Sequence, residues 1–254
     1  MEDEQTQYDD DGSPGEAGFE NEPPDPPEEA IVISSGMLAP EPPRDARIDF
    51  EKGISYAPRL TLTIIGVNVI VFIWELATGA LESKDSIIAA GALYRPLVME
   101  GEAWRMVTAM FLHAGFDHLI GNCIILYVLG MACEHALGWK QTVVLYLVAG
   151  LCGAVLSMAA SPGPSIGASG AIFGIAGAVI VFMHRFQRFF IFRNKRVGAV
   201  LLVWAIYSIG LGFATPYVDN FCHIGGLVGG AAFSLLLRVR LLGPAAAEQA
   251  TEPG

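Results

Sequence analysis

The sequence predicts an all-α polytopic membrane protein with six transmembrane helices. The 254 residues are 53% hydrophobic, with a mean hydropathy of +0.48. Only 16% of the residues are charged, whereas a soluble domain carries about 25%. A helix that crosses a bilayer needs roughly 20 mostly apolar residues. Six apolar runs approach that length, and they lie at residues 60–76, 106–131, 142–159, 168–183, 197–213 and 224–242.

The segment before the first span is predicted to be a disordered, acidic, proline-rich tail over residues 1–55. Residues 1–51 hold 16 of the 26 acidic residues, two of the 15 basic residues and eight of the 15 prolines. Such a segment buries too little apolar surface to offset the entropy of ordering. Its weakly apolar stretch at 30–37 is too short for a signal peptide or a span. The membrane domain is therefore assigned to residues 56–243, and a short disordered C-terminal tail to 244–254.

The distribution of basic residues predicts the orientation. With six spans both termini lie on one side, which would hold 12 of the 15 basic residues. The other side would hold only Lys84, Arg95 and Arg105. Because cytoplasmic loops carry an excess of Lys and Arg, the termini are expected in the cytosol. The basic, Phe-rich loop 185–196 then either determines topology or contacts anionic headgroups.

Polar side chains at the start of the second span are the first candidates for chemistry. Groups of this kind are rare inside a bilayer and usually face the bundle interior or water. His118 and Asn122 are four residues apart, so they share one helix face. Both can donate hydrogen bonds, as a developing oxyanion requires. The alternative is interhelical hydrogen bonding.

The fourth and sixth spans each carry a residue suited to nucleophilic catalysis. Ser169 starts the fourth span, and His223 precedes the sixth. Close packing of the two helices would bring the hydroxyl within hydrogen-bond reach of the imidazole, which suits proton acceptance near neutral pH. The alternatives are a small residue at a helix crossing and an interfacial histidine. Glycines at four-residue spacing permit such packing, and they are Gly170 and Gly174 on the fourth span and Gly226 and Gly230 on the sixth.

Metal and disulfide chemistry are not expected. The four cysteines show no Cys-x-x-Cys spacing and lie in or beside spans, where a thiol behaves as a small apolar group. His113 and His118 are five residues apart and lack the His-Glu-x-x-His pattern of zinc proteases. No metal, cofactor or nucleic-acid partner is therefore predicted.

Five short motifs follow one another along the predicted membrane domain. They are Gly-Glu-x-Trp-Arg at 101–105, His-x4-His-x3-Asn at 113–122, Glu-x3-Gly at 134–138, Gly-x-Ser-Gly at 167–170 and His-x2-Gly-x3-Gly at 223–230. In this order and at these spacings they resemble the motifs of the rhomboid family of intramembrane serine proteases. The resemblance covers roughly residues 59–242, and the acidic tail has no counterpart in it.

The resemblance implies a role for each matching residue. Ser169 would be the nucleophile and His223 its general base, in a dyad without a third carboxylate. His118, Asn122 and the backbone amide of Ser169 would form the oxyanion hole. Asp219, although four residues before His223, is not expected to be a triad member.

Further residues would support this site. Those expected to do so are Glu102 and Arg105, which would brace the loop after the first span, His113, which would buttress it, Gly226, which would let the helices touch, and Phe173, which would stack on His223 where many members have Tyr.

The implied function is an intramembrane serine endopeptidase without a cofactor. It would hydrolyse peptide bonds in or near the transmembrane helices of membrane-protein substrates, within the lipid bilayer. A compact six-span core resembles bacterial members, so the inner (plasma) membrane is the expected location. The alternatives are a catalytically silent relative that binds membrane helices, a small transporter and a structural scaffold. No inverted repeat or pair of broken helices supports a transporter.

Overall fold

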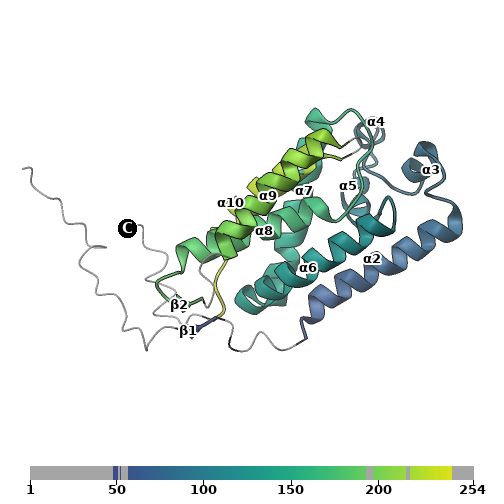
Figure 1. Cartoon of the computed structure of the whole chain (residues 1–254). Helices are drawn as coiled ribbons and strands as arrows, with labels where there is room; N and C mark the ends of the chain where they lie inside the picture. The colour runs from purple at the N-terminus through teal and green to yellow at the C-terminus, as the bar shows by residue number, and fades with distance from the viewer. Residues whose placement is uncertain (1–47, 51, 53–56, 193–196, 216–217, 242–254) are drawn as a thin grey trace, which may run out of the picture. The chain divides into compact units, whose positions relative to one another are not determined.

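A computed structural model describes residues 48–50, 52, 57–192, 197–215 and 218–241 (Figure 1). The chain divides into two compact units, and all of these residues belong to the second, Glu41–Pro253. The described part is predominantly helical, as predicted. The predicted tails, apart from residues near position 50, lie outside the described residues.

Six long helices build the bundle in Figure 1. Among the described residues, three of them, α2, α6 and α7, are long and apolar enough to cross a membrane. Helix α8 has 17 residues and α10 has 15, and α10 packs most extensively against α8 and α7. The helices are α2 (Arg59–Thr78), α6 (Phe116–Leu137), α7 (Trp139–Ala160), α8 (Ser169–Arg185), α9 (Val197–Ala214) and α10 (Asn220–Ser234).

The predicted bounds of the second span were wrong. The apolar run 106–131 is not one helix, because its first third folds as α5 (Arg105–Thr108), the 3-10 turn η2 (Ala109–Phe111) and an extended turn. The helix itself begins at Phe116 and continues to Leu137. Hydropathy reports burial in an apolar environment rather than helicity, so a buried loop and a helix give the same signal.

The sixth span also differs from its prediction. Helix α10 begins at Asn220, so His223 lies inside its first turn. The helix ends at Ser234, although the predicted span runs to residue 242. Beyond it the apolar chain leaves the helical path, and the Arg240 backbone N–H donates to the carbonyl oxygen of Ala136 at the end of α6.

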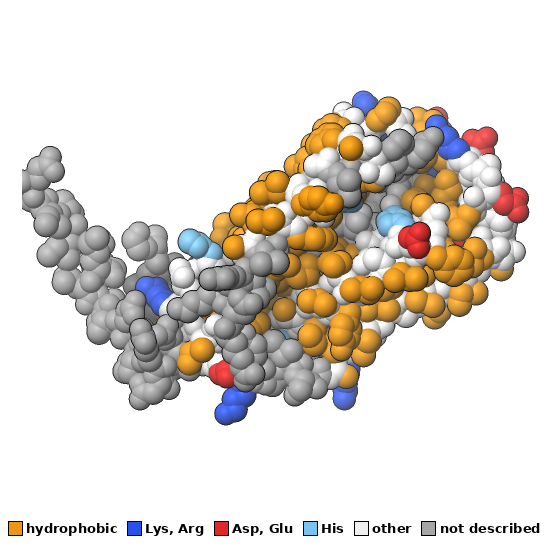
Figure 2. Space-filling model, in the orientation of Figure 1, with side chains coloured by type: hydrophobic (Ala, Val, Ile, Leu, Met, Phe, Trp, Pro, Cys, Tyr) orange, Lys and Arg blue, Asp and Glu red, His pale blue; other side chains and the backbone are white. Residues whose placement is uncertain are grey.

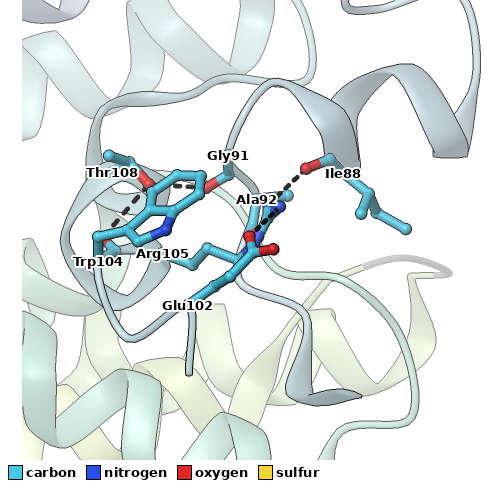
Figure 3. A network of polar contacts seen from close by, with 7 residues as sticks. All are labelled: Ile88, Gly91, Ala92, Glu102, Trp104, Arg105 and Thr108. Carbon is cyan, nitrogen blue, oxygen red and sulfur yellow. Dashed lines mark hydrogen bonds and ion pairs between the residues drawn. The ribbon is translucent and has the colours of Figure 1, made fainter. Parts of the chain in front are cut away.

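The segment between α2 and α6 is a folded loop that contains several short helices. It contains α3 (Lys84–Ala89), α4 (Arg95–Met99) and α5. Arg105 is buried at its centre and forms an ion pair of 2.7 Å with Glu102. The same guanidinium donates to the carbonyl oxygens of Ile88 and Ala92 (Figure 3). The predicted contact that braces this loop is therefore confirmed.

A short strand pair ties the segment before α2 to the connection between α8 and α9. β1 (Ile48–Asp49) runs parallel to β2 (Phe190–Ile191), with Ile48 opposite Phe190. Phe50 follows β1 and is 8% exposed. Its ring lies 5.2 Å from that of Phe182 and 5.3 Å from that of Phe192. These residues, assigned to the tail by the sequence, thus pack on the bundle.

Most of the described surface on the face in Figure 2 is hydrophobic, and charged side chains gather toward the ends of the helices. Large exposed apolar side chains lie along several of the long helices, among them Ile70 and Ile73 on α2 and Val203 and Ile206 on α9. Surfaces of this extent on a water-soluble monomer are rare, and they fit contact with lipid.

Candidate active site

Helices α8 and α10 cross with their backbones in contact. A β-carbon at Gly226 would overlap the carbonyl oxygen of Gly170, and one at Gly230 would overlap that of Gly174. Only glycine fits at these two points, because any side chain there would separate the helices. The close packing predicted from the glycine spacing is confirmed.

This crossing brings the predicted hydroxyl and imidazole together. Ser169 is the first residue of α8, and His223 lies in the first turn of α10. The Ser169 Oγ and the His223 Nε2 are 2.8 Å apart, which is a normal hydrogen-bond length. Among the described residues, the buried Nδ1 of His223 has no hydrogen-bond partner. The predicted contact is confirmed, and no third group of the described chain orients the ring through Nδ1.

The imidazole is held instead by stacked rings. Phe173, one turn into α8, lies 4.4 Å from the His223 ring at an interplanar angle of 11°. Trp204 of α9 stacks on Phe173 at 5.0 Å. The first contact was predicted, but the role of Trp204 was not. The sequence around Trp204 gives no sign of this contact, because an aromatic residue on an apolar helix can face lipid as readily as it can face a neighbouring helix.

His118 and Asn122 lie on α6, beside the Ser169–His223 pair, and offer two donors. The Nδ1 of His118 accepts from the backbone N–H of Ala114 at 3.3 Å. A neutral ring that accepts at Nδ1 carries its proton on Nε2. The Asn122 Nδ2 is buried without a hydrogen-bond partner among the described residues. Both groups can therefore donate to a ligand that the chain itself does not supply.

A cavity of about 540 Å³ connects these groups. Its wall is formed by α6, α8, α9, α10 and the loop before α8. Asp117 and Asp219 are also among its lining residues, whereas none of the described lining residues is Lys or Arg. The residues named above that line it are His118, Asn122, Ser169, Phe173, Trp204 and His223.

Asp219 caps α10 rather than completing a triad. Its carboxylate accepts hydrogen bonds from the hydroxyls of Ser157 and Ser161 and from the Cys222 backbone N–H. Burial alone would raise the pKa of Asp219, but hydrogen bonds from these groups and from Ser165 hold the pKa below its usual value. An Asp directly before a helix is a common N-cap, which is the signal in the sequence that identifies this role.

His113 lies behind the cavity, in the turn before α6, and is fully buried. Its backbone N–H donates to the Glu75 carboxylate of α2 at 3.1 Å, and its Nδ1 lies 3.1 Å from the Phe111 carbonyl oxygen. Burial lowers the pKa of His113 to about 4, so the ring is neutral at physiological pH. The predicted buttress is present, and Glu75 is the partner that the sequence did not identify.

Fold and site together define a class of protein: a polytopic helical membrane protein with a Ser–His pair of the kind that serine hydrolases use. Residues 100–240 match the sequence model of a protein family that is described as the Rhomboid domain. This match covers more than half of the chain. It includes the motif residues named above at the cavity or at the helix crossing, which are His118, Asn122, Ser169, Gly170, His223, Gly226 and Gly230. The chain therefore belongs to the rhomboid family.

Several curated relatives are similar to the chain. Rhomboid protease GluP of Bacillus subtilis (strain 168) is 36% identical over 173 residues, which are 68% of this chain and 34% of that protein. RHOMBOID-like protein 5 of Arabidopsis thaliana is 40% identical over 58% of the chain and 49% of its own length. Rhomboid protease AarA of Providencia stuartii is 28% identical over 69% and 71%, respectively. The chain thus spans half or less of the length of the first two.

Proposed function

We propose that this rhomboid is an active intramembrane serine endopeptidase in which Ser169 is the nucleophile and His223 its general base. The observation that carries the proposal is the 2.8 Å contact between the Ser169 Oγ and the His223 Nε2. A serine hydroxyl is a weak nucleophile until a neighbouring base accepts its proton. Two of the relatives are named rhomboid proteases, which adds support.

The same geometry supports a complete reaction. Ser169 attacks the substrate carbonyl carbon as His223 takes its proton. The tetrahedral oxyanion then accepts hydrogen bonds from the His118 Nε2–H, the Asn122 Nδ2–H and the backbone N–H of Ser169, whose position at a helix N-terminus adds a favourable dipole. His223 protonates the leaving amine, and water hydrolyses the acyl-enzyme. No cofactor is needed for these steps.

The substrates in this proposal are transmembrane helices of other membrane proteins. A helix hides its peptide bonds, so it must unwind locally before Ser169 can reach one. Substrates with small or helix-breaking residues near the outer face are therefore favoured. We place the docking site beside α6 and α9, where the cavity wall combines Gly121 of α6 with Trp204 and Ser208 of α9.

The proposed location is a bacterial plasma membrane, with both termini in the cytosol and the cavity open to the opposite side. The support is the distribution of the basic residues, because with six spans only Lys84, Arg95 and Arg105 lie on the side opposite the termini. The acidic N-terminal tail is proposed to remain a solvated cytosolic segment.

The test is cleavage of a helical membrane substrate by the pure protein in detergent or lipid. We expect Ser169→Ala and His223→Ala to abolish cleavage. The matched controls are Ser234→Ala, which removes a hydroxyl at the far end of α10, outside the cavity, and His184→Ala, which removes an exposed histidine at the end of α8. Both controls should retain activity. Unchanged cleavage by the Ser169→Ala protein would refute the nucleophile assignment.

The alternative is a catalytically silent rhomboid that binds membrane helices. It predicts co-purification of a helical substrate without cleavage, and no labelling of Ser169 by a fluorophosphonate. Labelling that disappears in Ser169→Ala and in His223→Ala would exclude it, because only an activated hydroxyl reacts with this reagent.

A further inference from the structure

Two further residues of α6 face the cavity beside His118 and Asn122. Asp117 and Gly121 are four residues apart, so they lie one above the other on the helix surface. Both line the cavity and both are exposed. A β-carbon at Gly121 would have nothing within 4 Å. The helix thus places a carboxylate beside an open notch, one residue away from a proposed oxyanion donor.

The two carboxylates of the cavity differ in what they bind. Asp219 is occupied by two hydroxyls and a backbone N–H. Asp117, by contrast, has no hydrogen bond or ion pair with any residue that the structure describes, and no described lining residue is Lys or Arg. The carboxylate is therefore available to a ligand in the cavity.

We propose that Asp117 determines specificity by selecting substrates with a Lys or Arg side chain next to the scissile bond. The inference depends on the proposed protease function. Apolar walls of low dielectric strengthen and focus the field of a carboxylate. The notch at Gly121 accommodates the long apolar stem of a basic side chain, and a guanidinium can bind the carboxylate with two parallel hydrogen bonds. An acidic side chain at the same substrate position is repelled.

Such a filter would separate a minority of substrates from most membrane helices. In the proposed orientation the cavity opens to the non-cytosolic side. Basic residues are uncommon at that end of transmembrane helices, because they are concentrated in cytoplasmic loops. A single charge contact there therefore discriminates more than the same contact at the cytosolic end.

The experiment uses the full-length protein and identical helical substrates that carry Lys, Gln or Glu at each position within four residues of the cleaved bond. For one position, we expect wild-type kcat/KM to be about fivefold higher with Lys than with Gln, and lower still with Glu. Asp117→Asn should remove the preference, and Asp117→Lys should reverse it toward Glu. The matched control is Asp85→Asn, which removes an exposed first-turn carboxylate on α3, away from the cavity. The control should keep the wild-type preference.

Equal kcat/KM for the three substrates at every position, or an unchanged preference in Asp117→Asn, would overturn the inference. Fluorophosphonate labelling of Ser169 reports on the dyad independently of the substrate charge. Its absence in the wild-type protein, together with no cleavage of the Gln substrates, would count against the protease function itself. Normal labelling and cleavage without a charge preference would overturn only the role of Asp117.

Discussion

At the scale of single residues, the carboxylate of Asp219 does not orient the histidine as the aspartate of a Ser-His-Asp triad does. Asp219 sets the start of α10 by accepting from Ser157, Ser161 and the Cys222 backbone. The ring of His223 is held by the face of Phe173 instead. Aromatic pairs of this kind contribute about 0.5–1.5 kcal/mol beyond their buried area. Among the described residues, no carboxylate accepts a hydrogen bond from the His223 Nδ1.

The capping role of Asp219 predicts how stability depends on pH. Its pKa in the folded protein is below its usual value, so its contribution is fully present above the unfolded pKa of about 4. That contribution is lost as the pH falls through the lower, folded pKa. We therefore expect the Tm of the purified protein to decrease as the pH is lowered below about 4. The Asp219→Asn protein should have a lower Tm than the wild type at neutral pH, and its Tm should decrease less in acid.

The control for this prediction is Asp117→Asn, which removes a carboxylate that has no hydrogen bond among the described residues. Its Tm should follow the wild-type pH profile. A wild-type profile in Asp219→Asn as well would show that the capping hydrogen bonds do not contribute measurable stability. Thermal unfolding in one detergent across the pH range measures all three proteins.

The pair of Ser169 and His223 was predictable from the sequence, and some of its neighbours were not. The pair follows from local features, because each residue is followed by glycines at helical spacing. The contact of Glu75 with His113 joins residues 38 positions apart, and that of Trp204 with Phe173 joins two different helices. Such pairings depend on how distant segments are arranged, which composition and periodicity do not specify.

At the scale of the helix, the crossing of α8 and α10 controls the site. Gly226→Val would force the backbones apart, because the new side chain would overlap the Gly170 carbonyl group. Overpacking of this kind typically costs 1–3 kcal/mol. We expect the Ser169–His223 contact to break, with loss of fluorophosphonate labelling and of cleavage, and a lower Tm.

The matched control is Gly66→Val on α2, where a β-carbon would have nothing within 4 Å. This protein should keep its activity, and its Tm should change little. If Gly226→Val is labelled as efficiently as Gly66→Val, the contact between the two backbones is not required for the dyad. Labelling and Tm are measured on the same preparations.

The order of the six long helices was predictable, whereas their ends and the short helices α3, α4 and α5 between α2 and α6 were not. The long apolar runs mark the bundle because lipid and protein interior are both apolar. The same property hides the loop before α6 and the non-helical chain after α10, since both are apolar too. The correct start of α10 is marked by the capping residue Asp219 rather than by hydropathy.

At the scale of the whole molecule, the proposed orientation predicts which residues reagents can reach. We expect Lys84→Cys to react with a membrane-impermeant maleimide in intact cells. Lys140→Cys, at the start of α7, should react only after the membrane is permeabilised. Both lysines are exposed, so membrane topology rather than burial decides their reactivity.

The unmodified protein, with its four native cysteines, gives the background for this measurement. Labelling of Lys140→Cys, but not of Lys84→Cys, in intact cells would reverse the proposed orientation. Labelling of both from outside would contradict the arrangement of the helices between them.

The pairing of β1 with β2 has a practical consequence for shortened versions of the protein. Hydropathy suggests that the bundle would survive removal of everything before residue 56. Phe50, however, fills a space among Phe182, Phe190 and Phe192, and trimming at residue 56 would leave an open apolar hole next to the connection that leads from α8 to α9. A shortened protein that keeps both Phe50 and the pairing of β1 with β2 must start before Ile48.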